Sequence, residues 1–405
     1  MIPFSPPRID DKIINEVNDT LRSGWITTGR KTKLLEKKIA GYCRIPDVIC
    51  LSSATAGLEL ALRWFGVSKG DEVILPAYTY CSTANVIIHC GATPVFVDIQ
   101  KDDFNICTKE IRKHITGRTK VIIPVDIGGW TCDYSEINGI VEEEHIKRQF
   151  QPDNEVQQQL GRVLVLSDAA HSFGAEYLGK KTGALTDITV FSFHAVKNLT
   201  TAEGGAIVFN LPAPFDNRAL YDFFNTLSLH GQNKDAFAKL HGNAWQYDVV
   251  MAGYKANMTD IHASIGLVEI ERYENDTLKR RREIVESYNQ GLGRYNWAKL
   301  PVFQNDAKKS SCHLYLLRID GINEEQRNNI IQEIYKQGVS VNVHFQPLPM
   351  LSFYRNKGYS IEDYPVSFDN YQREISLPVY YNLTNSQTEK VISAVSTSVE
   401  KHIKS

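Results

Sequence analysis

The sequence predicts an α/β fold in which helices cover a mostly parallel β-sheet, followed by a smaller C-terminal α+β domain. Two observations lead to this prediction. From about residue 45 to about residue 250, short apolar runs that end in Asp, Pro or Ser alternate with stretches of helical length. Beyond residue 258, one long helical pattern is followed by mixed short elements. Nearly continuous apolar runs separated by helices indicate strands that are buried on both faces, as in parallel sheets.

Six apolar runs are the predicted strands of the large sheet. Each run is short, bounded by turn residues and rich in Val, Ile, Leu or Phe, which is typical of strands. We expect the segments between them to form helices that pack on the sheet. The runs cover residues 72–76, 94–98, 119–125, 162–168, 188–193 and 205–209.

The rest of the chain divides into an insertion, a linker and a small domain. Residues 141–160 are strongly polar and contain Pro152, so we expect a surface insertion rather than core. Residues 258–288 alternate apolar and charged residues at helical spacing, which predicts a long connecting helix. We therefore expect a large domain over residues 1–257 and a small domain over residues 258–405. Its predicted elements are a strand at 314–319, a helix at 324–337, strands at 339–345 and 375–378, and a helix at 386–401.

Composition and charge exclude several classes of protein. The 405 residues are 42% apolar and 23% charged, enough to bury a core without disulfides. A net charge of −2 provides no basic field for nucleic acid or an anionic membrane. No run reaches the about 18 apolar residues of a membrane span, and the first residues lack the pattern of a secretory signal. The seven cysteines are scattered without a Cys-x-x-Cys pair, so we expect reduced thiols, no metal site and a cytoplasmic protein.

The strongest candidate for chemistry is Lys197. It lies a few residues beyond a predicted buried strand and is followed by a polar loop and the turn Gly204-Gly205. Lysines are rarely placed close to a core, and a desolvated lysine has a lowered pKa that suits it to form a Schiff base. The alternative is a loop lysine whose ammonium reaches solvent, and the segment alone favours that alternative.

A second candidate is Asp168, at the end of another predicted strand. The carboxyl ends of parallel strands are where open α/β sheets bind ligands. A carboxylate there can keep a pyridinium nitrogen protonated, which makes the ring a better electron sink. The alternatives are a helix N-cap for Asp168 and a hydrogen-bonded structural role for the nearby His171, and each is the commoner outcome for such a residue alone.

The third candidate segment is residues 51–62, where small hydroxyl residues open an amphipathic helix after a short strand. Free N–H groups and the positive end of the helix dipole make such a start a phosphate site, although an ordinary Ser/Thr cap is commoner. Residues 76–80 then place Tyr78 and Tyr80 beyond a strand end. These rings either stack on a planar ligand or pack in the core.

Together and in this order, these segments resemble the fold-type I aminotransferases that use pyridoxal phosphate, and specifically the DegT/DnrJ/EryC1/StrS sugar aminotransferase family. The resemblance covers nearly the whole chain. Within the family, the similarity is greatest to the branch that makes UDP-4-amino-4-deoxy-L-arabinose. The runs that carry it are Ser-Gly-Trp-Ile-Thr-Thr-Gly at 23–29, Ser-Ser-Ala-Thr-Ala-Gly at 52–57, and most of residues 192–205.

The resemblance implies roles for the residues that match the family's motifs. Lys197 is similar to the lysine that forms the Schiff base with the cofactor and shuttles a proton. Asp168 would pair with the pyridine nitrogen, and His171 would lie near the ring and its 3-hydroxyl. Tyr80 would stack on the ring face. The phosphate would be held by Ala54, Thr55 and Ser192.

The resemblance also implies a homodimer with shared active sites. The family contacts the phosphate across the dimer through a Gly-Tyr-Asn-x-Arg motif, and this chain reads Gly-Tyr-Lys-Ala-Asn at 253–257. The amide and the basic residue have exchanged places, so both Lys255 and Asn257 are candidates, with a solvated loop as the alternative. In the small domain, residues 343–345 match a stretch that lines the sugar pocket, with His344 as the candidate substrate residue.

Two segments depart from the family pattern. The polar insertion at residues 141–160 is longer than the family leads us to expect. Residues 126–127 are Asp-Ile where the arabinose branch has His-Tyr, so we expect the substrate side of the pocket to differ.

The resemblance implies a nucleotide-sugar aminotransferase that works in two half-reactions. L-Glutamate donates its amino group to the cofactor, and a 4-keto sugar on UDP or another nucleoside diphosphate then accepts it, for surface glycan or lipopolysaccharide biosynthesis. A 3-keto sugar is the nearest variant. Sugar dehydratases of the same family replace the Schiff-base lysine, and the presence of Lys197 argues against them. A non-catalytic regulator is the remaining alternative, but the chain has no helix-turn-helix or basic stripe.

Overall fold

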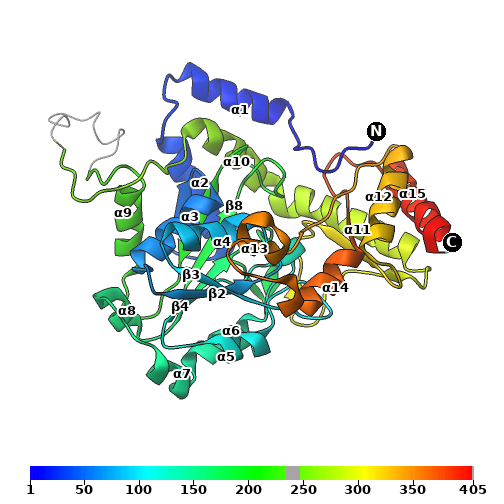
Figure 1. The fold of residues 1–405 in the computed structure, drawn as a ribbon. Helices are drawn as coiled ribbons and strands as arrows, with labels where there is room; N and C mark the ends of the chain where they lie inside the picture. The colour runs from blue at the N-terminus through cyan, green and yellow to red at the C-terminus, as the bar shows by residue number, and fades with distance from the viewer. Residues whose placement is uncertain (234–246, 404–405) are drawn as a thin grey trace.

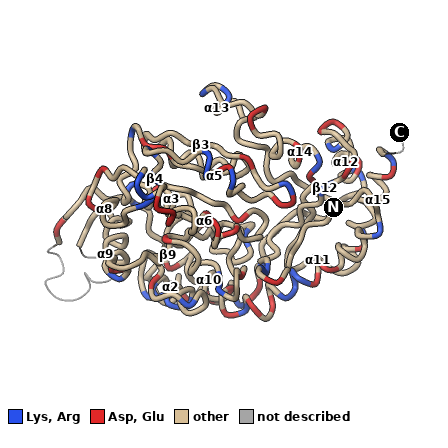
Figure 2. The backbone as a smooth tube through the Cα atoms, turned by 90° about the horizontal axis from the view of Figure 1, so that it is seen from below, with Lys and Arg blue, Asp and Glu red and all other residues tan. Residues whose placement is uncertain are grey.

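A seven-stranded sheet lies at the centre of the molecule, with helices on both faces and a smaller domain beside it (Figure 1). The computed structural model describes residues 1–233 and 247–403. Lys and Arg are interspersed with Asp and Glu along the whole tube (Figure 2), which agrees with the small net charge of −2. In the described part of the chain, no helix combines the length and the apolar character needed to cross a membrane.

The large sheet has the strand order β1-β9-β8-β5-β4-β2-β3, and the predicted α/β fold is confirmed. The pairs from β3 through β8 are parallel, whereas β9 runs antiparallel to both of its neighbours. All six predicted strands are present. With β1 as the seventh strand, the bounds in the sheet are β1 Val48–Leu51, β2 Glu72–Pro76, β3 Thr93–Val97, β4 Thr119–Ile122, β5 Leu164–Asp168, β8 Ile188–Ser192 and β9 Gly205–Phe209.

Helix α1 packs on the helix at Asp260–Arg272 at the top of the view in Figure 1, and the helices between the strands cover the sheet. They bury apolar residues against the strands in a core that extends over the whole sheet. Their bounds are α1 Asp11–Arg22, α2 Arg30–Cys43, α3 Ala54–Trp64, α4 Cys81–His89, α5 Thr108–His114, α6 Tyr134–Glu142, α7 Glu144–Gln149, α8 Glu155–Leu160 and α9 Asn217–Leu227, with a 3-10 turn η1 at Ile127–Gly129.

The polar insertion contributes to the core, so the expectation of a purely surface segment is wrong in part. Helices α7 and α8 turn polar residues to solvent, but Ile146 and Phe150 are buried in the core of the large sheet. The side chain of Gln157 is also buried and donates a hydrogen bond of 2.8 Å to the carbonyl of Phe65. A few well-spaced apolar residues are enough to anchor a polar helix.

The predicted connecting helix consists of three consecutive pieces. The first, α10 (Asp260–Arg272), packs on α2, and its apolar residues share a cluster with those of α2. A π-helical turn (η3, Tyr273–Leu278) follows, and then α11 (Lys279–Leu292), whose apolar face lies in the core of the small domain. The change of packing partner therefore falls at the π turn, beyond the predicted domain boundary at 257/258.

The small domain is built on a three-stranded sheet of order β10-β12-β13. A second three-stranded sheet, β11-β6-β7, joins residues 308–309 to a hairpin of the large domain. The remaining elements are β6 Glu176–Tyr177, β7 Lys180–Lys181, β10 Ala298–Lys299, β11 Lys308–Lys309, β12 Tyr315–Ile319, α12 Glu324–Lys336, η4 Leu348–Met350, α13 Ser352–Arg355, η5 Ile361–Asp363, α14 Pro365–Arg373, β13 Glu374–Leu377 and α15 Asn385–Ile403.

The predicted strand at 339–345 is wrong. Val339 and Asn342 form only isolated bridges, to Ile2 and Ser376 respectively. Pairing with β13 ends after Asn342, because the next amide to face that strand, that of His344, donates to the side chain of Glu374 instead of to a backbone carbonyl. This local break turns residues 343–345 toward the large domain.

Candidate active site

A cavity of about 450 Å³ lies at the edge of the sheet where the parallel strands end, and residues from both domains line it. The carboxyl ends of β5 and β8 and the start of α3 meet at this edge, as expected for an open α/β sheet. The N-terminal segment also contributes, through Phe4 and Ser5. The cavity brings together eight of the predicted site residues, namely Ala54, Thr55, Tyr80, Asp168, His171, Ser192, Lys197 and His344.

Asp168 ends β5 and is buried, with 4% of its surface exposed. Thr83 in the first turn of α4 donates to Oδ2 at 2.8 Å, and the amide of Ala170 donates to Oδ1 at 3.2 Å. Burial raises the pKa of this carboxyl, and the two hydrogen bonds and Lys197 oppose that shift. No Lys or Arg in the described ranges forms an ion pair with Asp168, so its carboxyl is oriented but not neutralised.

Lys197 lies in the loop between β8 and β9, and its backbone N–H donates to the carbonyl of His194 at 2.9 Å. Burial lowers the pKa of its amine to about 8, while the charge of Asp168 acts in the opposite direction. Within residues 1–233 and 247–403, no side chain or carbonyl hydrogen-bonds to the Lys197 amine. A lysine with a lowered pKa and no partner is available as a nucleophile or a base.

His171 is held as a neutral ring. The backbone N–H of Gly128, at the η1 turn, donates to Nδ1 at 3.2 Å. Burial lowers the pKa of His171 well below its usual range, and the Lys197 ammonium and His344 add to the effect. Because Nδ1 accepts a hydrogen bond, the ring proton of neutral His171 lies on Nε2, which is therefore its donor.

The start of α3 presents unused backbone donors to the cavity. Ser53 caps the helix by accepting from the amide of Ala56 at 3.1 Å. No group in the described ranges accepts from the amides of Ala54 and Thr55. A Cβ on Gly205 would lie 2.5 Å from the backbone N of Ala54, so only glycine lets β9 approach the helix start this closely.

Tyr80 and Ser192 lie at the rim of the cavity. Tyr80 precedes α4, with 59% of its surface exposed, and its ring centroid is 6.0 Å from that of Phe345. Ser192 ends β8, and its hydroxyl accepts from the amide of His194 at 3.4 Å. Both side chains therefore have surface that faces the cavity and is not used by the protein core.

His344 reaches the cavity from the small domain. Its Nδ1 lies 2.9 Å from the hydroxyl of Ser376, and its carbonyl accepts from Tyr78 at 2.7 Å. Phe4 stacks on the ring with centroids 5.4 Å apart. Burial lowers the pKa of His344 to about 4, and the Lys197 charge adds to the effect.

Lys255 and Asn257 do not line the cavity of their own chain. The Lys255 ammonium donates to Asn257 Oδ1 at 2.6 Å, and Asn257 Nδ2 donates to the hydroxyl of Thr28 at 2.5 Å. The carbonyl of Ala256 between them accepts from the amide of Ser52 at 2.7 Å. The pair is thus fixed close to the start of α3 without lining its own cavity.

The sequence did not identify three residues that support the site, namely His313, Asn198 and Thr83, whereas Phe345 lies within the predicted stretch at 343–345. His313 lines the cavity, and its Nδ1 lies 2.9 Å from Oδ1 of Asn198, the residue after Lys197. Asn198 also donates to the carbonyl of Ser311 at 2.7 Å, which ties the lysine loop to the small domain. Thr83 orients Asp168, and Phe345 lies against His171 with ring centroids 5.8 Å apart. The position of Asn198 next to Lys197 was the one available sequence signal.

These residues fit a phosphorylated pyridine ring. Open amides at a helix start bind phosphate, and a carboxyl without a cation partner can hold a protonated ring nitrogen. The donor His171 Nε2–H suits a ring hydroxyl, and an exposed aromatic ring at the rim suits a ring face. The unpartnered amine of Lys197 completes the set.

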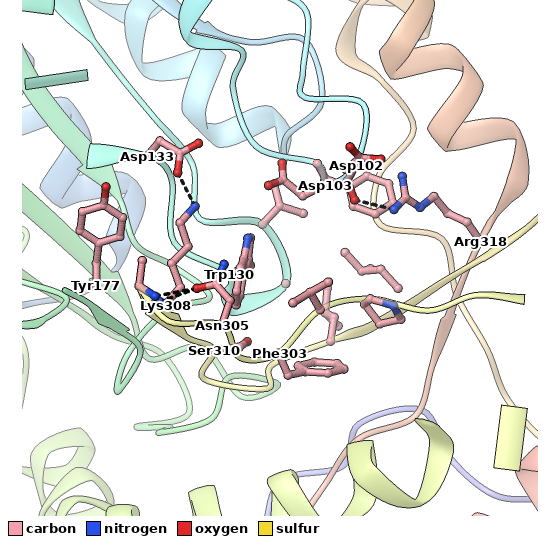
Figure 3. Close-up of a pocket in the computed structure, with 18 residues that line it drawn as sticks. Asp102, Asp103, Trp130, Asp133, Tyr177, Phe303, Asn305, Lys308, Ser310 and Arg318 are labelled. Carbon is pink, nitrogen blue, oxygen red and sulfur yellow. Dashed lines mark hydrogen bonds and ion pairs between the residues drawn. The ribbon is translucent and has the colours of Figure 1, made fainter. Parts of the chain in front are cut away.

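A second cavity, of about 360 Å³, holds none of the predicted site residues (Figure 3). It lies between the η1 turn and residues 301–310, and at one side of it Lys308 pairs with Asp133 at 2.7 Å. Asp126, expected near the substrate, lines neither cavity: it is fully buried and accepts from Ser172 Oγ at 2.6 Å and from Tyr134. Its role is to brace the turn after β4.

Comparison with protein families matches one family over nearly the whole chain. The profile of the DegT/DnrJ/EryC1/StrS aminotransferase family matches residues 7–150 and 153–396. The spore coat polysaccharide biosynthesis protein SpsC of Bacillus subtilis is 36% identical over 400 residues, 97% of this chain and 96% of SpsC.

Solved structures of two proteins extend the similarity to three dimensions. The putative sugar aminotransferase Spr1654 of Streptococcus pneumoniae, in its PMP-form, superposes with a TM-score of 0.95 at 45% identity, covering 99% of this chain and 100% of Spr1654. Its PLP-form gives a TM-score of 0.94. Helicobacter pylori PseC, an aminotransferase involved in the biosynthesis of pseudoaminic acid, gives 0.85 at 26% identity over 99% of both chains. This chain belongs to the DegT/DnrJ/EryC1/StrS aminotransferase family.

Proposed function

From this family membership we propose that the chain is a pyridoxal-phosphate-dependent sugar aminotransferase. It moves the amino group of L-glutamate onto a 4-keto sugar carried by UDP or another nucleoside diphosphate. The observation that carries the proposal is the Lys197 amine, which has a pKa of about 8 and no partner among the described residues, in one cavity with Asp168 and the open start of α3. A 3-keto sugar is the nearest variant of the acceptor.

The large domain supplies the residues that would hold the cofactor. The amides of Ala54 and Thr55, with the hydroxyls of Thr55 and Ser192, would bind its phosphate. Asp168 would hold the ring nitrogen protonated, and His171 would donate to the ring hydroxyl from Nε2. Tyr80 would cover a ring face, since its ring is exposed at the rim.

When bound, the cofactor supplies an electron-withdrawing ring that stabilises negative charge on the substrate carbon. Lys197 is placed to take the proton from that carbon in the donor half-reaction and to return one in the acceptor half-reaction. A group with a pKa of about 8 suits both tasks, because it exchanges protons readily near neutral pH. His313 and His344 exclude water from the small-domain side, and their neutral rings offer hydrogen bonds to polar substrates.

The relatives support a sugar substrate and a glycan pathway. Spr1654 is a putative sugar aminotransferase, SpsC acts in spore coat polysaccharide biosynthesis, and PseC in the biosynthesis of pseudoaminic acid. By analogy, this chain would act in the cytoplasm. Its product would then be used to build a surface glycan or lipopolysaccharide. L-Glutamate is proposed as donor on the resemblance of the chain to its family.

The active sites are proposed to be shared in a homodimer. Lys255 and Asn257 are held near the start of α3 but outside the cavity of their own chain, which suits a contact with the phosphate site of a partner. Mixing Lys197→Ala subunits with Lys255→Ala subunits tests this. Each mixed dimer then contains one site with both residues intact, so activity should recover above that of either variant alone.

An absorbance spectrum tests the proposed function. The purified protein should show the visible band of the bound cofactor, and L-glutamate should shift it to the aminated form. Lys197→Ala should lose the band, whereas a matched control such as Lys37→Ala, on the exposed face of α2, should keep it. A protein that stays colourless after incubation with pyridoxal phosphate would contradict the proposal.

A further inference from the structure

Four histidines line the cavity beside Lys197, namely His171, His194, His313 and His344, and His171 and His313 have a fixed tautomer. His171 accepts at Nδ1 from the amide of Gly128, so its proton lies on Nε2. Asn198 uses its amide nitrogen to donate to Ser311, which leaves Oδ1 to accept from Nδ1 of His313. Backbone and amide groups have one polarity each, so neither ring can change its tautomer without losing a bond.

His344 is different, because its Nδ1 is bound to a hydroxyl. Ser376 Oγ lies 2.9 Å from Nδ1 and in turn bonds to Oε1 of Glu374. The other carboxyl oxygen, Oε2, accepts from the backbone N–H of His344 at 3.0 Å. A hydroxyl both donates and accepts, so this chain of bonds can run in either direction.

The Glu374 carboxyl, which ends this series of hydrogen bonds, is buried without a cation partner in the described part of the chain. Glu374 and Ser376 are fully buried, and no Lys or Arg in the described ranges forms an ion pair with Glu374. Burial raises the pKa of Glu374 to about 8, against the hydrogen bonds from Ser376 and His344 and the more distant charges of Arg327 and Arg318. Two other titratable groups lie beside it: Tyr78, whose hydroxyl donates to the His344 carbonyl, and Arg327, whose Nη1 donates to the backbone carbonyl of Glu374 at 3.2 Å.

The ring of His344 is kept neutral mainly by its burial. Burial lowers the pKa of His344 to about 4, and the Lys197 ammonium adds to the effect. His171, His194 and His313 line the same cavity, as does Glu203, which lies 3.5 Å from the ring of His194. The ring therefore stays neutral at pH values where Glu374 changes charge. Titration of Glu374 can then move the ring proton between nitrogens without charging the ring.

We propose that Glu374, Ser376 and His344 form a proton relay that decides whether the cavity-facing nitrogen of His344 donates or accepts a hydrogen bond. With Glu374 protonated, its O–H donates to Ser376, Ser376 donates to Nδ1, and Nε2–H is a donor. With Glu374 ionised, Ser376 donates to the carboxylate and accepts from Nδ1–H, and Nε2 is an acceptor.

When Glu374 ionises, the relay loses one proton in total. The Nε2 proton leaves to water or to a bound group, the Ser376 proton moves to Nδ1, and the Glu374 proton moves to Ser376 Oγ. The relay thus goes from neutral to a charge of −1, and only the carboxylate ends charged. Glu374 and Ser376 act on the cavity through His344 and are positioning residues.

The relay gives the small-domain side of the cavity two hydrogen-bonding states, one for each of two different substrates. This consequence rests on the proposed function. An amino donor presents a carboxylate, which needs a donor, whereas a sugar presents hydroxyls, which can use an acceptor. His344 can serve either without taking up a charge.

Nitrogen NMR of the full-length protein with ¹⁵N-labelled histidine tests the relay without any substrate. His344→Gln identifies the His344 signals. As the pH rises through the Glu374 pKa of about 8, the proton of His344 should move from Nε2 to Nδ1, while the tautomers of His171 and His313 stay unchanged. Glu374→Gln should abolish the transition and lock the proton on Nε2, because the Gln amide donates to Ser376 at every pH.

Two further variants separate the relay from a merely structural role. Ser376→Ala should abolish the transition, and Ser376→Thr, which keeps the hydroxyl, should restore it. A His344 tautomer that does not change across this pH range would overturn the proposal, as would a transition that persists in Glu374→Gln. Both results are independent of whether the protein transaminates.

Discussion

The two walls of the cavity hold their polar side chains in different ways. On the large-domain wall, Asp168 and His171 follow a central strand and are held in part by backbone N–H groups. On the small-domain wall, His344 lies in a segment with only isolated bridges and is held by the side chains of Ser376 and Glu374. Backbone donors have one polarity, whereas hydroxyl and carboxyl groups adapt. The difference suits a wall for one constant cofactor and a wall for two substrates.

The largest effect is expected from a change in the large-domain wall, here called the fixed wall because backbone N–H groups help to hold its side chains. Asp168→Asn keeps the shape of the side chain but removes the charge, and should lower the rate of the donor half-reaction by about 10²–10⁴-fold, the range for loss of a positioned catalytic group. Stopped-flow absorbance after addition of L-glutamate measures it. Thr83→Ser, which keeps the hydroxyl that donates to Asp168, is the matched control and should stay close to wild type. Similar losses in both variants would show that packing, not charge, matters here.

The second test concerns the reactivity of Lys197. Because burial lowers its pKa to about 8, its amine becomes nucleophilic as pH rises through 8 rather than through the usual 10.5. Near pH 8 the free-amine fraction should exceed that of an ordinary lysine by roughly 100-fold. Labelling of the cofactor-free protein with an amine-reactive reagent across pH, read by mass spectrometry with the other lysines as internal reference, measures the midpoint.

Asp168→Asn sharpens this measurement. Asp168 raises the pKa of Lys197 against the effect of burial, so its neutralisation should move the labelling midpoint to lower pH. A midpoint that moves upward, or one that matches the other lysines in the wild type, contradicts the description of the fixed wall.

The third test addresses the close approach of β9 to α3. Gly205→Ala places a Cβ 2.5 Å from the backbone N of Ala54, which should destabilise the fold by about 1–3 kcal/mol and displace the phosphate site. Gly139→Ala, where a Cβ meets nothing within 4 Å on exposed α6, should instead stabilise it by about 0.5–1 kcal/mol. Urea denaturation gives both values. Unchanged cofactor affinity in Gly205→Ala would show that the start of α3 is not the phosphate site.

The smallest effect is expected from a change in the small-domain wall, where hydroxyl and carboxyl side chains hold His344. His344→Gln should weaken transfer to the keto sugar several-fold, the worth of one hydrogen bond of about 0.5–1.5 kcal/mol, and leave the cofactor spectrum unchanged. Steady-state kcat/KM for the sugar, with the absorbance spectrum beside it, separates the two walls. If the spectrum shifts along with kcat/KM, the division of labour between the walls is wrong.

Sequence patterns predicted the large sheet well, because each strand carries its own signal. Short Val- and Ile-rich runs form buried strands wherever helices cover both faces, and their ends place Asp168 and Ser192 at one edge. The segment at 339–345 has a similar composition but forms no strand, since the Glu374 side chain takes the amide that would continue the ladder. No local sequence pattern indicates that a side chain will compete with the backbone for this amide.

The sequence by itself therefore determined the fold class, because each strand and helix carries its own pattern. It predicted the lysine, the carboxylate and the helix start through the resemblance of their segments to a family's motifs. Only the tertiary structure decided which groups support them. Thr83 reaches Asp168 across 85 residues and His313 reaches Asn198 across 115, contacts that exist only once the sheet and the small domain are packed. The relay behind His344 likewise depends on contacts across the sequence: Glu374 lies 30 residues and Ser376 lies 32 residues beyond His344, and the two segments share almost no regular pairing. Burial, which only packing creates, then sets the pKa values on which the chemistry depends.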